Sequence, residues 1–475
     1  MDNFPRRPAG PGMLALVGGA MTGSTGARGT HRTLSPGCCP RCFLGFLRLR
    51  GPHMHPMVKP ALRRGWRDLN TVQFGMTPAH ALTLGPVDTA TGSFLELLNG
   101  TRGLPLLREE GRRMDLPEGH VDRLVTRLAR AGLLDDARGG GAAARALREK
   151  KEVLDRLRPD LASLSLVARE PGEAIDRLAA RRDLRVQVRG AGRVGAVLAA
   201  LLSGAGIGEV DVLDGGCVEP WDVAPGGLPV EAVGERRTAA ARRAVRRAAP
   251  DRPARRGPGA PHESHVSHET RESHESYESY GDGEPGHSLV ILAPRDDLTV
   301  HAPDPVAAAA LITSGTPHLY AGVVEATGVV GPLVLPGQTG CAECLHRGRT
   351  DRDETWPRLV AQWRSGRRRH VRPCDLALAT TVAGLAAAQA LAFLDGESPS
   401  GVGVRWEVSA PGLNWRARPV WPHPDCPCGA GRKPVAEDTS NEGASRETMA
   451  GQRPSSTPCR RADAARLAGT WRAHV

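Results

Sequence analysis

The chain has 475 residues, enough for two or three domains, and 40% of them are apolar, so it can build a sizeable core. Aromatic residues contribute only 4%, which leaves Leu, Val and Ala to form most of that core. The net charge of +11 comes almost entirely from arginine, and no basic stripe with interleaved aromatic residues accompanies it, which argues against nucleic-acid binding.

Residues 1–56 are rich in Gly and Pro and lack apolar periodicity, so we expect a disordered extension there. Its beginning, "MDNFPRRPAGPGMLALVGGAM", resembles a weak secretory signal, but prolines flank the arginines and glycines interrupt the short apolar run. Patterned sequence begins only after Met54 and Met57, which we expect to be the true starts. Because no run of 18 apolar residues is present, we expect no membrane span and a cytoplasmic protein.

Residues 57–136 form the first patterned unit. The segments "TVQFG" and "HALTL" predict two short strands, and "TATGSFLELLNG" and "GLPLLREEGR" predict helices. The clearest helix lies in "PEGHVDRLVTRLARAGLLDD", where Val121, Leu124, Val125 and Leu128 form one apolar stripe. We expect Pro117 to start this helix, Gly132 to cap it, and the two leucines after Gly132 to pack back.

This arrangement of two strands and three helices resembles a winged helix, and in particular the PqqD-like domain that captures leader peptides in ribosomal peptide maturation. The resemblance lies in pattern and spacing. Winged helices also bind DNA, and Arg123, Arg127 and Arg130 are candidates for a recognition helix. The same three arginines are equally expected on the solvated face of the Val121 helix, so the regulatory alternative stays open.

A helical linker is expected over residues 137–183. After it the sequence changes to a pattern of alternating strands and helices. In "DLRVQVRGAGRVGAVLAALLSGAGIGEVDVLDGG" a strand leads into Gly190, Gly192 and Gly195, which form GxGxxG. A helix with Val194, Val197, Leu198, Leu201 and Leu202 turned inward follows, and then a second strand ends at Asp214. Strand, glycine turn, helix, strand and acid together predict a Rossmann-like half that binds phosphate at the turn and ribose at Asp214. A tight turn that binds nothing remains the alternative.

Later segments complete this α/β domain, which we place at residues 184–429. A His/Glu/Ser repeat predicts a disordered insertion over 255–286. Further strands are expected at "HSLVILA", "HLYAGVVEA", "GVVGPLVLPGQTG" and "VGVRWEVS", with helices at "DPVAAAALITSG" and from Asp375 to Leu394. Cys374 precedes the last helix and is a candidate reactive thiol, because a helix N-terminus lowers a thiol pKa. Residues 430–475 are polar and patternless, so a disordered tail is expected.

Two cysteine pairs stand out, "CAEC" at Cys341 and Cys344 and "CPC" at Cys426 and Cys428. Ten cysteines are too sparse for a disulfide scaffold, and their pairing favours metal in a reducing compartment over a disulfide hairpin. Four thiolates suit a closed, tetrahedral structural zinc site. Reduced free cysteines are the alternative.

The glycine turn, the acid after the second strand, "VGPLV" before "PGQTGCAEC" and the late cysteine pair together resemble the ThiF/MoeB/ubiquitin-activating superfamily. The resemblance covers about residues 184–429. It implies ATP- and magnesium-dependent adenylation of a peptide or carrier C-terminus, and zinc on Cys341, Cys344, Cys426 and Cys428. It also implies that Gly190, Gly192, Gly195 and Asp214 bind nucleotide and that Asp296 is associated with magnesium and ATP.

The sequence departs from the family pattern at the pyrophosphate. In "LDGGCVEPWDVAPGG" Gly216 replaces an acid and Pro225 stands where the family has an arginine, while Arg237 replaces its lysine. Adenylation needs cations where charge develops on the pyrophosphate, and arginine does not simply replace lysine at such a site. Arg193, Arg236 and Arg295 are nearby candidates to substitute. The catalytic residues implied here are therefore Asp296 and Arg237, in a degenerate site.

We therefore predict an α/β protein: a Rossmann-like ThiF-type domain with a zinc knuckle, preceded by a small winged-helix-like domain. This pairing resembles the ThiF-type proteins of thiazole/oxazole peptide maturation, which bind a precursor leader peptide and present it to a YcaO-type partner enzyme. An active adenylyltransferase for a peptide or a sulfur-carrier protein is the alternative. Homodimers are usual in the superfamily, so a homodimer is the expectation by analogy.

Overall fold

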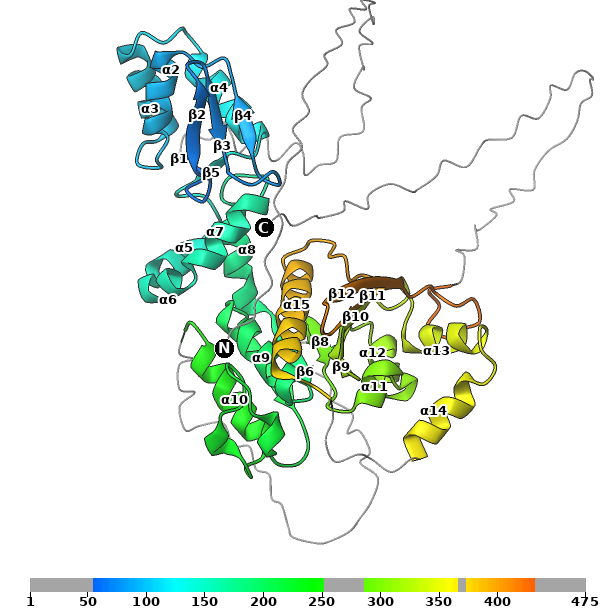
Figure 1. Cartoon of the computed structure of the whole chain (residues 1–475). Helices are drawn as coiled ribbons and strands as arrows, with labels where there is room; N and C mark the ends of the chain where they lie inside the picture. Colours follow the sequence, from blue (N-terminus) through cyan, green and yellow to red (C-terminus); the bar gives the residue numbers. More distant parts are fainter. Residues whose placement is uncertain (1–53, 252–285, 366–372, 432–475) are drawn as a thin grey trace, which may run out of the picture. The chain divides into compact units, whose positions relative to one another are not determined.

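The computed structural model describes residues 54–251, 286–365 and 373–431 of the chain (Figure 1). The extension predicted at 1–56 lies almost wholly outside these ranges, as do most of the predicted insertion and nearly all of the predicted tail. The described residues form a small α/β module, a group of short helices, and a larger α/β domain built on a seven-stranded sheet.

The N-terminal module contains a three-stranded antiparallel sheet and three helices around one apolar core. The sheet has the order β2-β3-β4, so β4 is an edge strand. A separate antiparallel pair, β1 with β5, joins the two ends of the module. Its elements are β1 (Pro56–Val58), β2 (Arg64–Asp68), β3 (Thr71–Phe74), β4 (Leu82–Leu84), α2 (Thr89–Phe94), η1 (Leu95–Leu97), α3 (Leu104–Arg113), α4 (His120–Arg130) and β5 (Leu134–Asp136). The two strands predicted from the sequence are present as β3 and β4, whereas β1, β2 and β5 were not predicted.

Helix α4 confirms the predicted apolar stripe, since Val121, Leu124, Val125 and Leu128 are all buried. Its predicted start at Pro117 is wrong. Residues 117–119 form a turn instead, with Gly119 in the left-handed region at φ +71°, and the helix begins at His120. The predicted end is confirmed: Gly132 has φ +71°, and the Leu133 amide donates to the Leu128 carbonyl (2.9 Å), which is the Schellman pattern.

The predicted linker is helical and has a small core of its own. Its elements are α5 (Ala142–Glu149), α6 (Lys151–Arg156), α7 (Arg158–Val167), α8 (Glu173–Ala180) and η2 (Arg181–Asp183). Lys59 from the module is only 2% exposed, and its Nζ donates to the Ala168 carbonyl at the end of α7 (2.7 Å). A cation at a helix C-terminus is favoured by the exposed carbonyls there.

The larger domain is built on one sheet of order β12-β11-β10-β9-β8-β6-β7. β6, β7, β8 and β9 run parallel, and β9 to β12 are antiparallel neighbours. The strands are β6 (Arg185–Arg189), β7 (Glu209–Leu213), β8 (Leu289–Leu292), β9 (His318–Val324), β10 (Thr327–Val334), β11 (Val404–Ser409) and β12 (Asn414–Pro419). β6 lies between β7 and β8, so the chain leaves β6 in one direction and later returns on its other side. In open α/β sheets this reversal point is where ligands bind.

Three long helices supply the main core against the sheet: α9 (Arg193–Gly204), α10 (Arg237–Ala248) and α15 (Leu376–Leu394) (Figure 1). Leu201 was predicted to point inward with its neighbours but is 42% exposed. α9 packs against β6 and β7 and also between α10 and α15, so it is buried almost all round. Leu201 is the one exposed position of this helix. The prediction that it turns inward with the other four apolar residues is therefore wrong.

The remaining elements of the larger domain are helices. They are η3 (Pro220–Asp222), η4 (Val230–Ala232), α11 (Asp297–His301), α12 (Pro305–Thr313), α13 (Ala342–Thr350) and α14 (Trp356–Ser365). α13, α14 and β12 were not predicted from the sequence. Among the described residues, α15 alone is long and apolar enough to cross a membrane by length and composition. Its Ala379, Val382 and Ala386 lie in the domain core, so we interpret it as a core helix.

Candidate functional site

The glycine turn lies between β6 and α9, and each of its three glycines is required by close contacts. A Cβ at Gly190, which has φ +111°, would lie 2.0 Å from the Ala293 carbonyl oxygen. A Cβ at Gly195 would lie 1.9 Å from the Gly190 oxygen. At Gly192 a Cβ would lie 2.8 Å from Cγ of Arg295, so this arginine side chain crosses the turn. The turn therefore has the tight geometry that the sequence predicted, and a side chain lies against its second glycine.

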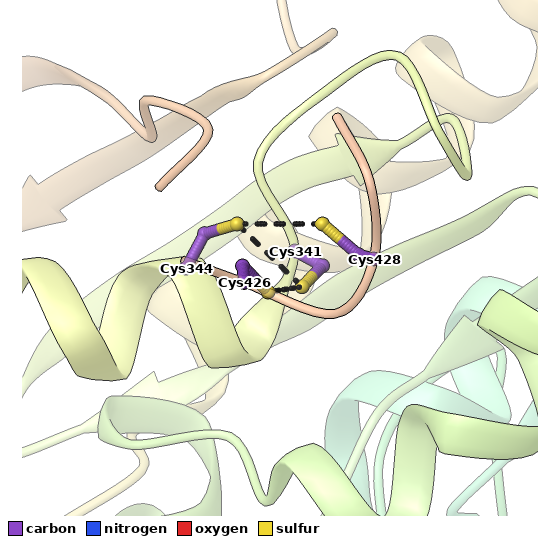
Figure 2. A group of neighbouring side chains, drawn as sticks. All are labelled: Cys341, Cys344, Cys426 and Cys428. Atoms are coloured by element: carbon purple, nitrogen blue, oxygen red, sulfur yellow. Dashed lines mark hydrogen bonds between the residues drawn. The ribbon is translucent and has the colours of Figure 1, made fainter. Parts of the chain in front are cut away.

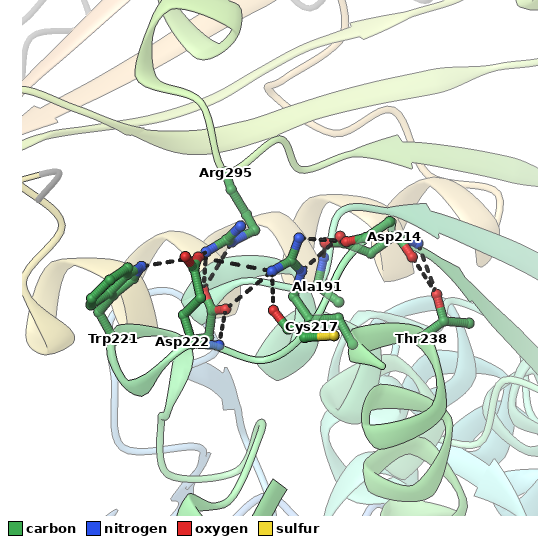
Figure 3. Close-up of polar contacts among 10 residues, drawn as sticks. Ala191, Asp214, Cys217, Trp221, Asp222, Thr238 and Arg295 are labelled. Carbon is green, nitrogen blue, oxygen red and sulfur yellow. Dashed lines mark hydrogen bonds and ion pairs between the residues drawn. The ribbon is translucent and has the colours of Figure 1, made fainter. Parts of the chain in front are cut away.

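Asp214, the predicted ribose acid, directly follows β7 and is already engaged (Figure 3). One carboxylate oxygen accepts the Ala191 amide of the glycine turn (2.6 Å). The other accepts Nε of Arg237 (2.7 Å). Both side chains are largely buried, at 8% and 10% exposed. Each oxygen keeps a second lone pair, so a ribose hydroxyl would have to share Asp214 with these two donors.

Arg237, the residue in place of the family lysine, begins α10 and points back into this site. Its guanidinium also donates to the carbonyl oxygens of Gly215 and Cys217. Gly216 has φ +76°, and a Cβ there would lie 2.9 Å from Nη2 of Arg237. The glycine at 216 and the arginine at 237 are thus structurally linked, because the glycine makes room for the end of the guanidinium.

A second arginine in the site is paired with two acids that the sequence reasoning missed. Nε of Arg295 donates to Asp222 (2.9 Å), and its Nη2 pairs with Glu219 and with Asp222 (2.8 Å) (Figure 3). The hydrogen bond from Arg295 holds the pKa of Glu219 below its usual value. Asp222 is buried and also lies 3.6 Å from Arg237. The segment "VEPWD" carried this signal, two acids three residues apart beside the family's pyrophosphate position.

The other predicted residues lie close by with separate roles. Asp296 is the N-cap of α11, and its carboxylate accepts the Thr299 hydroxyl (2.8 Å). Arg193 donates to the Cys374 carbonyl (2.9 Å), so this arginine holds the chain before α15. Cys374 was predicted to be reactive because a helix N-terminus would lower its pKa. Burial instead raises the pKa of this thiol, so that reason is wrong. Asp375, and not Cys374, caps the helix.

The four late cysteines form the second group. Cys341 and Cys344 lie at the start of α13, and Cys426 and Cys428 lie in the loop after β12 (Figure 2). Their sulfurs are all within 4.8 Å of one another, and the contacts between neighbours are 3.5–3.8 Å. Three of the four are buried. Hydrogen bonding to Cys344 and burial raise the pKa of the Cys341 thiol. Four thiolates within 4.8 Å of one another would repel strongly, so a cation is needed to hold them all deprotonated. The group has the donor set and spacing to hold a metal ion.

A cleft of about 370 Å³ lies outside both groups, beside the edge strand β4. The preceding loop and β4 form one wall, the end of α4 a second, and the end of α7 a third. Its apolar lining includes Leu82, 42% exposed, and Val167, 51% exposed, with two arginines also in the wall. The lining residues are Leu62, Ala79, His80, Ala81, Leu82, Arg130, Ala131, Gly132, Leu166, Val167, Ala168 and Arg169.

The sequence model of the ThiF family matches residues 169–429, more than half of the chain. The chain belongs to the ThiF family. No curated protein sequence matches it.

Solved structures support this fold over most of the chain. E. coli MccB with succinimide has a TM-score of 0.56 at 16% identity, covering 80% of this chain and 100% of that one. E. coli MccB with ATP has a TM-score of 0.52 at 14% identity, covering 78% and 99%. The heterocyclase TruD has a TM-score of 0.50 at 17% identity, covering 79% of this chain but only 43% of that one. At these identities the likeness shows the fold alone.

Proposed function

We propose that this ThiF-family chain acts in ribosomal peptide maturation by binding the leader of a precursor peptide and presenting it to a partner enzyme. In this proposal residues 57–136 form a winged-helix-like recognition domain, residues 137–183 connect it, and residues 184–429 form the ThiF-type domain. The partner would be a YcaO-type enzyme, and the complex would assemble in the cytoplasm, with a homodimer as the default by family analogy.

The observation that carries this proposal is the cleft beside β4. An edge strand offers unpaired backbone N–H and C=O groups, to which an extended peptide can add as another strand. The cleft lies next to that edge, so apolar side chains of the added peptide could bury against Leu82 and Val167. Arg130 and Arg169 in its wall favour a peptide with nearby acidic residues. The solved MccB structures include a complex with N-formylated MccA, which supports a peptide partner for this fold.

We further propose that the nucleotide site is degenerate. Pro225 provides no cation. The guanidinium of Arg237 already donates to Asp214 and to two carbonyl oxygens. Arg295 could substitute only by leaving Glu219 and Asp222. One preorganised donor to a transition state is typically worth about 3 kcal/mol, so the loss of two cations weakens adenylation strongly. The four cysteines would hold a structural zinc, which fixes the loop after β12 to the start of α13.

An active ATP- and magnesium-dependent adenylyltransferase is the second candidate. The intact glycine turn and Asp296 favour it, together with the MccB structure that contains ATP. Its substrate would be the C-terminal carboxylate of a peptide or of a sulfur-carrier protein. The two candidates differ in whether pyrophosphate is exchanged, not in whether peptide is bound.

Fluorescence anisotropy of the full-length protein tests peptide binding, with the precursor peptide from a neighbouring reading frame, labelled with fluorescein, as the probe. We expect saturable binding that Leu82→Glu weakens at least tenfold, because the new carboxylate enters the apolar cleft. Val167→Glu should act in the same way from the α7 wall. Leu69→Glu is the matched control, since Leu69 is 93% exposed, belongs to the same module and does not line the cleft. Unchanged affinity in both cleft variants, or no binding by the wild type, would reject the proposal.

A further inference from the structure

A group of arginines at the β12 end of the sheet is used by neither site described above. We call Arg349, Arg352, Arg405, Arg416 and Arg418 the arginine surface. Arg405 is 2% exposed and pairs with Glu407 (3.1 Å), and Arg418 pairs with the other oxygen of the same carboxylate (2.8 Å). One carboxylate thus already serves two guanidinium groups.

Arg349 places a third guanidinium close to that of Arg405. Its Nη1 donates to the His301 carbonyl (2.9 Å), and Nη1 of Arg405 donates to the same oxygen (3.3 Å). Within the described part of the chain, no carboxylate lies within ion-pair distance of Arg349, Arg352 or Arg416. Arg405, Arg352 and Arg418 all act on Arg349 electrostatically, and Glu407 is the one acid among its main neighbours. Glu407 thus pairs with both Arg405 and Arg418, while Arg349, Arg352 and Arg416 have no ion-pair partner among the described residues.

Aromatic rings fix part of this surface. The guanidinium of Arg349 lies over the Trp356 ring, 4.5 Å from its centroid. Trp356, Trp363 and His301 pack mutually edge to face, with ring centroids 5.7–6.0 Å apart. Although the chain has few aromatic residues, these rings hold the guanidinium of Arg349, which has no ion-pair partner among the described residues. An arginine with its orientation already fixed loses less entropy when it binds an anion.

Strand β12 lies beside these arginines and is an open edge. It is the first strand in the sheet order, and all six of its residues are exposed. Arg416 pairs across the sheet with Glu407, and Arg418 with Arg405, so both arginines project from the face that carries the arginine surface. Trp415 pairs with Val408, which belongs to the α15 core, and so lies on the opposite face with half of its surface exposed. An added strand would therefore meet cations on one face and an exposed indole on the other.

A second copy of this chain fits this edge poorly. Two β12 strands paired antiparallel about a two-fold axis place residues of the same face opposite each other. Any register that overlaps the two strands then brings Arg416 or Arg418 opposite, or diagonal to, an arginine of the other copy. Like charges in such cross-strand positions are destabilising. The charge of this edge instead complements an acidic strand.

We propose that β12 and the exposed members of the arginine surface, Arg352, Arg416 and Arg418, bind an acidic, extended segment of the peptide substrate, whose alternate carboxylates contact these arginines. The inference rests on the proposed function for the nature of its occupant, a peptide. It adds a second contact on the ThiF-type domain. Backbone pairing along β12 would set the peptide's direction, and bidentate arginine–carboxylate contacts would select acidic residues at every second position.

The test uses the full-length protein and a fluorescein-labelled octapeptide of alternating Glu and Thr, measured by anisotropy. We expect saturable binding that the double variant Arg416→Glu/Arg418→Glu weakens at least tenfold. Arg416→Glu alone, at an exposed residue without an ion-pair partner in the described ranges, should weaken it severalfold and guards against misfolding of the double variant. Arg246→Glu on α10 is the matched charge control and should bind as the wild type does.

Three outcomes would overturn the inference. One is equal binding of an octapeptide of alternating Glu and Pro, which keeps the charge but cannot pair as a strand. Another is unchanged affinity in both arginine variants. The third is a wild-type dimer that the double variant dissociates, without peptide binding, which would assign β12 to a second copy. Leu82→Glu should leave octapeptide binding intact, so failure of the leader-binding proposal and failure of this one are distinguishable.

Discussion

At the scale of single residues, hydrogen bonds and ion pairs within the chain surround the glycine turn. Asp214, the ribose-binding residue expected from the sequence, accepts a donor from within the chain on each of its oxygens. Arg237, expected at the position of a lysine, donates to two carbonyl oxygens in space that Gly216 leaves open. Gly216 and Arg237 are linked structurally, because a side chain at position 216 would need a left-handed backbone and would displace the end of the guanidinium.

Arg237→Ala should therefore destabilise the domain strongly. Removing one partner of a buried ion pair leaves the other charge uncompensated, which typically costs about 3–5 kcal/mol. Arg242→Ala on the same helix is the control, because its pair with Asp211 is much more exposed and is worth about 0–1 kcal/mol. Chemical denaturation of both variants measures the difference, and equal losses would show that Arg237 has no special structural role.

The four cysteines predict a second residue-scale outcome. Protein prepared without chelator should contain about one zinc per chain, as one tetrahedral site requires. Cys341→Ser should lose the metal and lower the melting temperature, because metal binding contributes to folding free energy. Cys217→Ser is the control, since Cys217 is an exposed free cysteine outside the group. A stable, metal-free wild type would contradict the zinc assignment.

At the scale of elements, sequence periodicity predicted those units whose own residues decide their structure. The Val121 stripe, the Gly132 end and the strand–glycine turn–helix unit from Arg185 all agree with the structure. β2 and β12 were missed because their residues are mostly exposed and polar, so no apolar alternation marks them. Leu201 was wrongly predicted to be buried. Which side of α9 stays exposed depends on the helices and strands that pack around it, and the sequence of α9 alone does not show these. Glu219 and Asp222 were missed because only folding brings them to Arg295.

The end of α4 offers a prediction at this scale. Gly132 is left-handed, with open space where a Cβ would lie, so Gly132→Ala should cost only the backbone strain, about 1 kcal/mol. Gly384→Ala, inside α15 and also facing open space, should instead be neutral or stabilise by about 0.5–1 kcal/mol. Thermal unfolding of the two variants provides the comparison. Destabilisation of similar size in both would contradict the assigned role of Gly132.

At the scale of the whole molecule, the chain has the ThiF family match, the glycine turn and the grouped cysteines. Our proposal is that the ion pairs around this turn leave the fold without its adenylation chemistry. Among the described residues, the cleft beside β4 and the exposed arginines beside β12 are the two surfaces that we propose bind an extended peptide. On this account the fold serves as a peptide-binding scaffold with two points of attachment.

The most direct test of this account is ATP–pyrophosphate exchange by the full-length protein, with magnesium and a precursor peptide whose binding to the same preparation has been measured. We predict no exchange above that of the protein without peptide, while the peptide stays bound. Robust peptide-dependent exchange that Asp296→Ala abolishes, without loss of peptide binding, would contradict the account and establish the chain as an active adenylyltransferase.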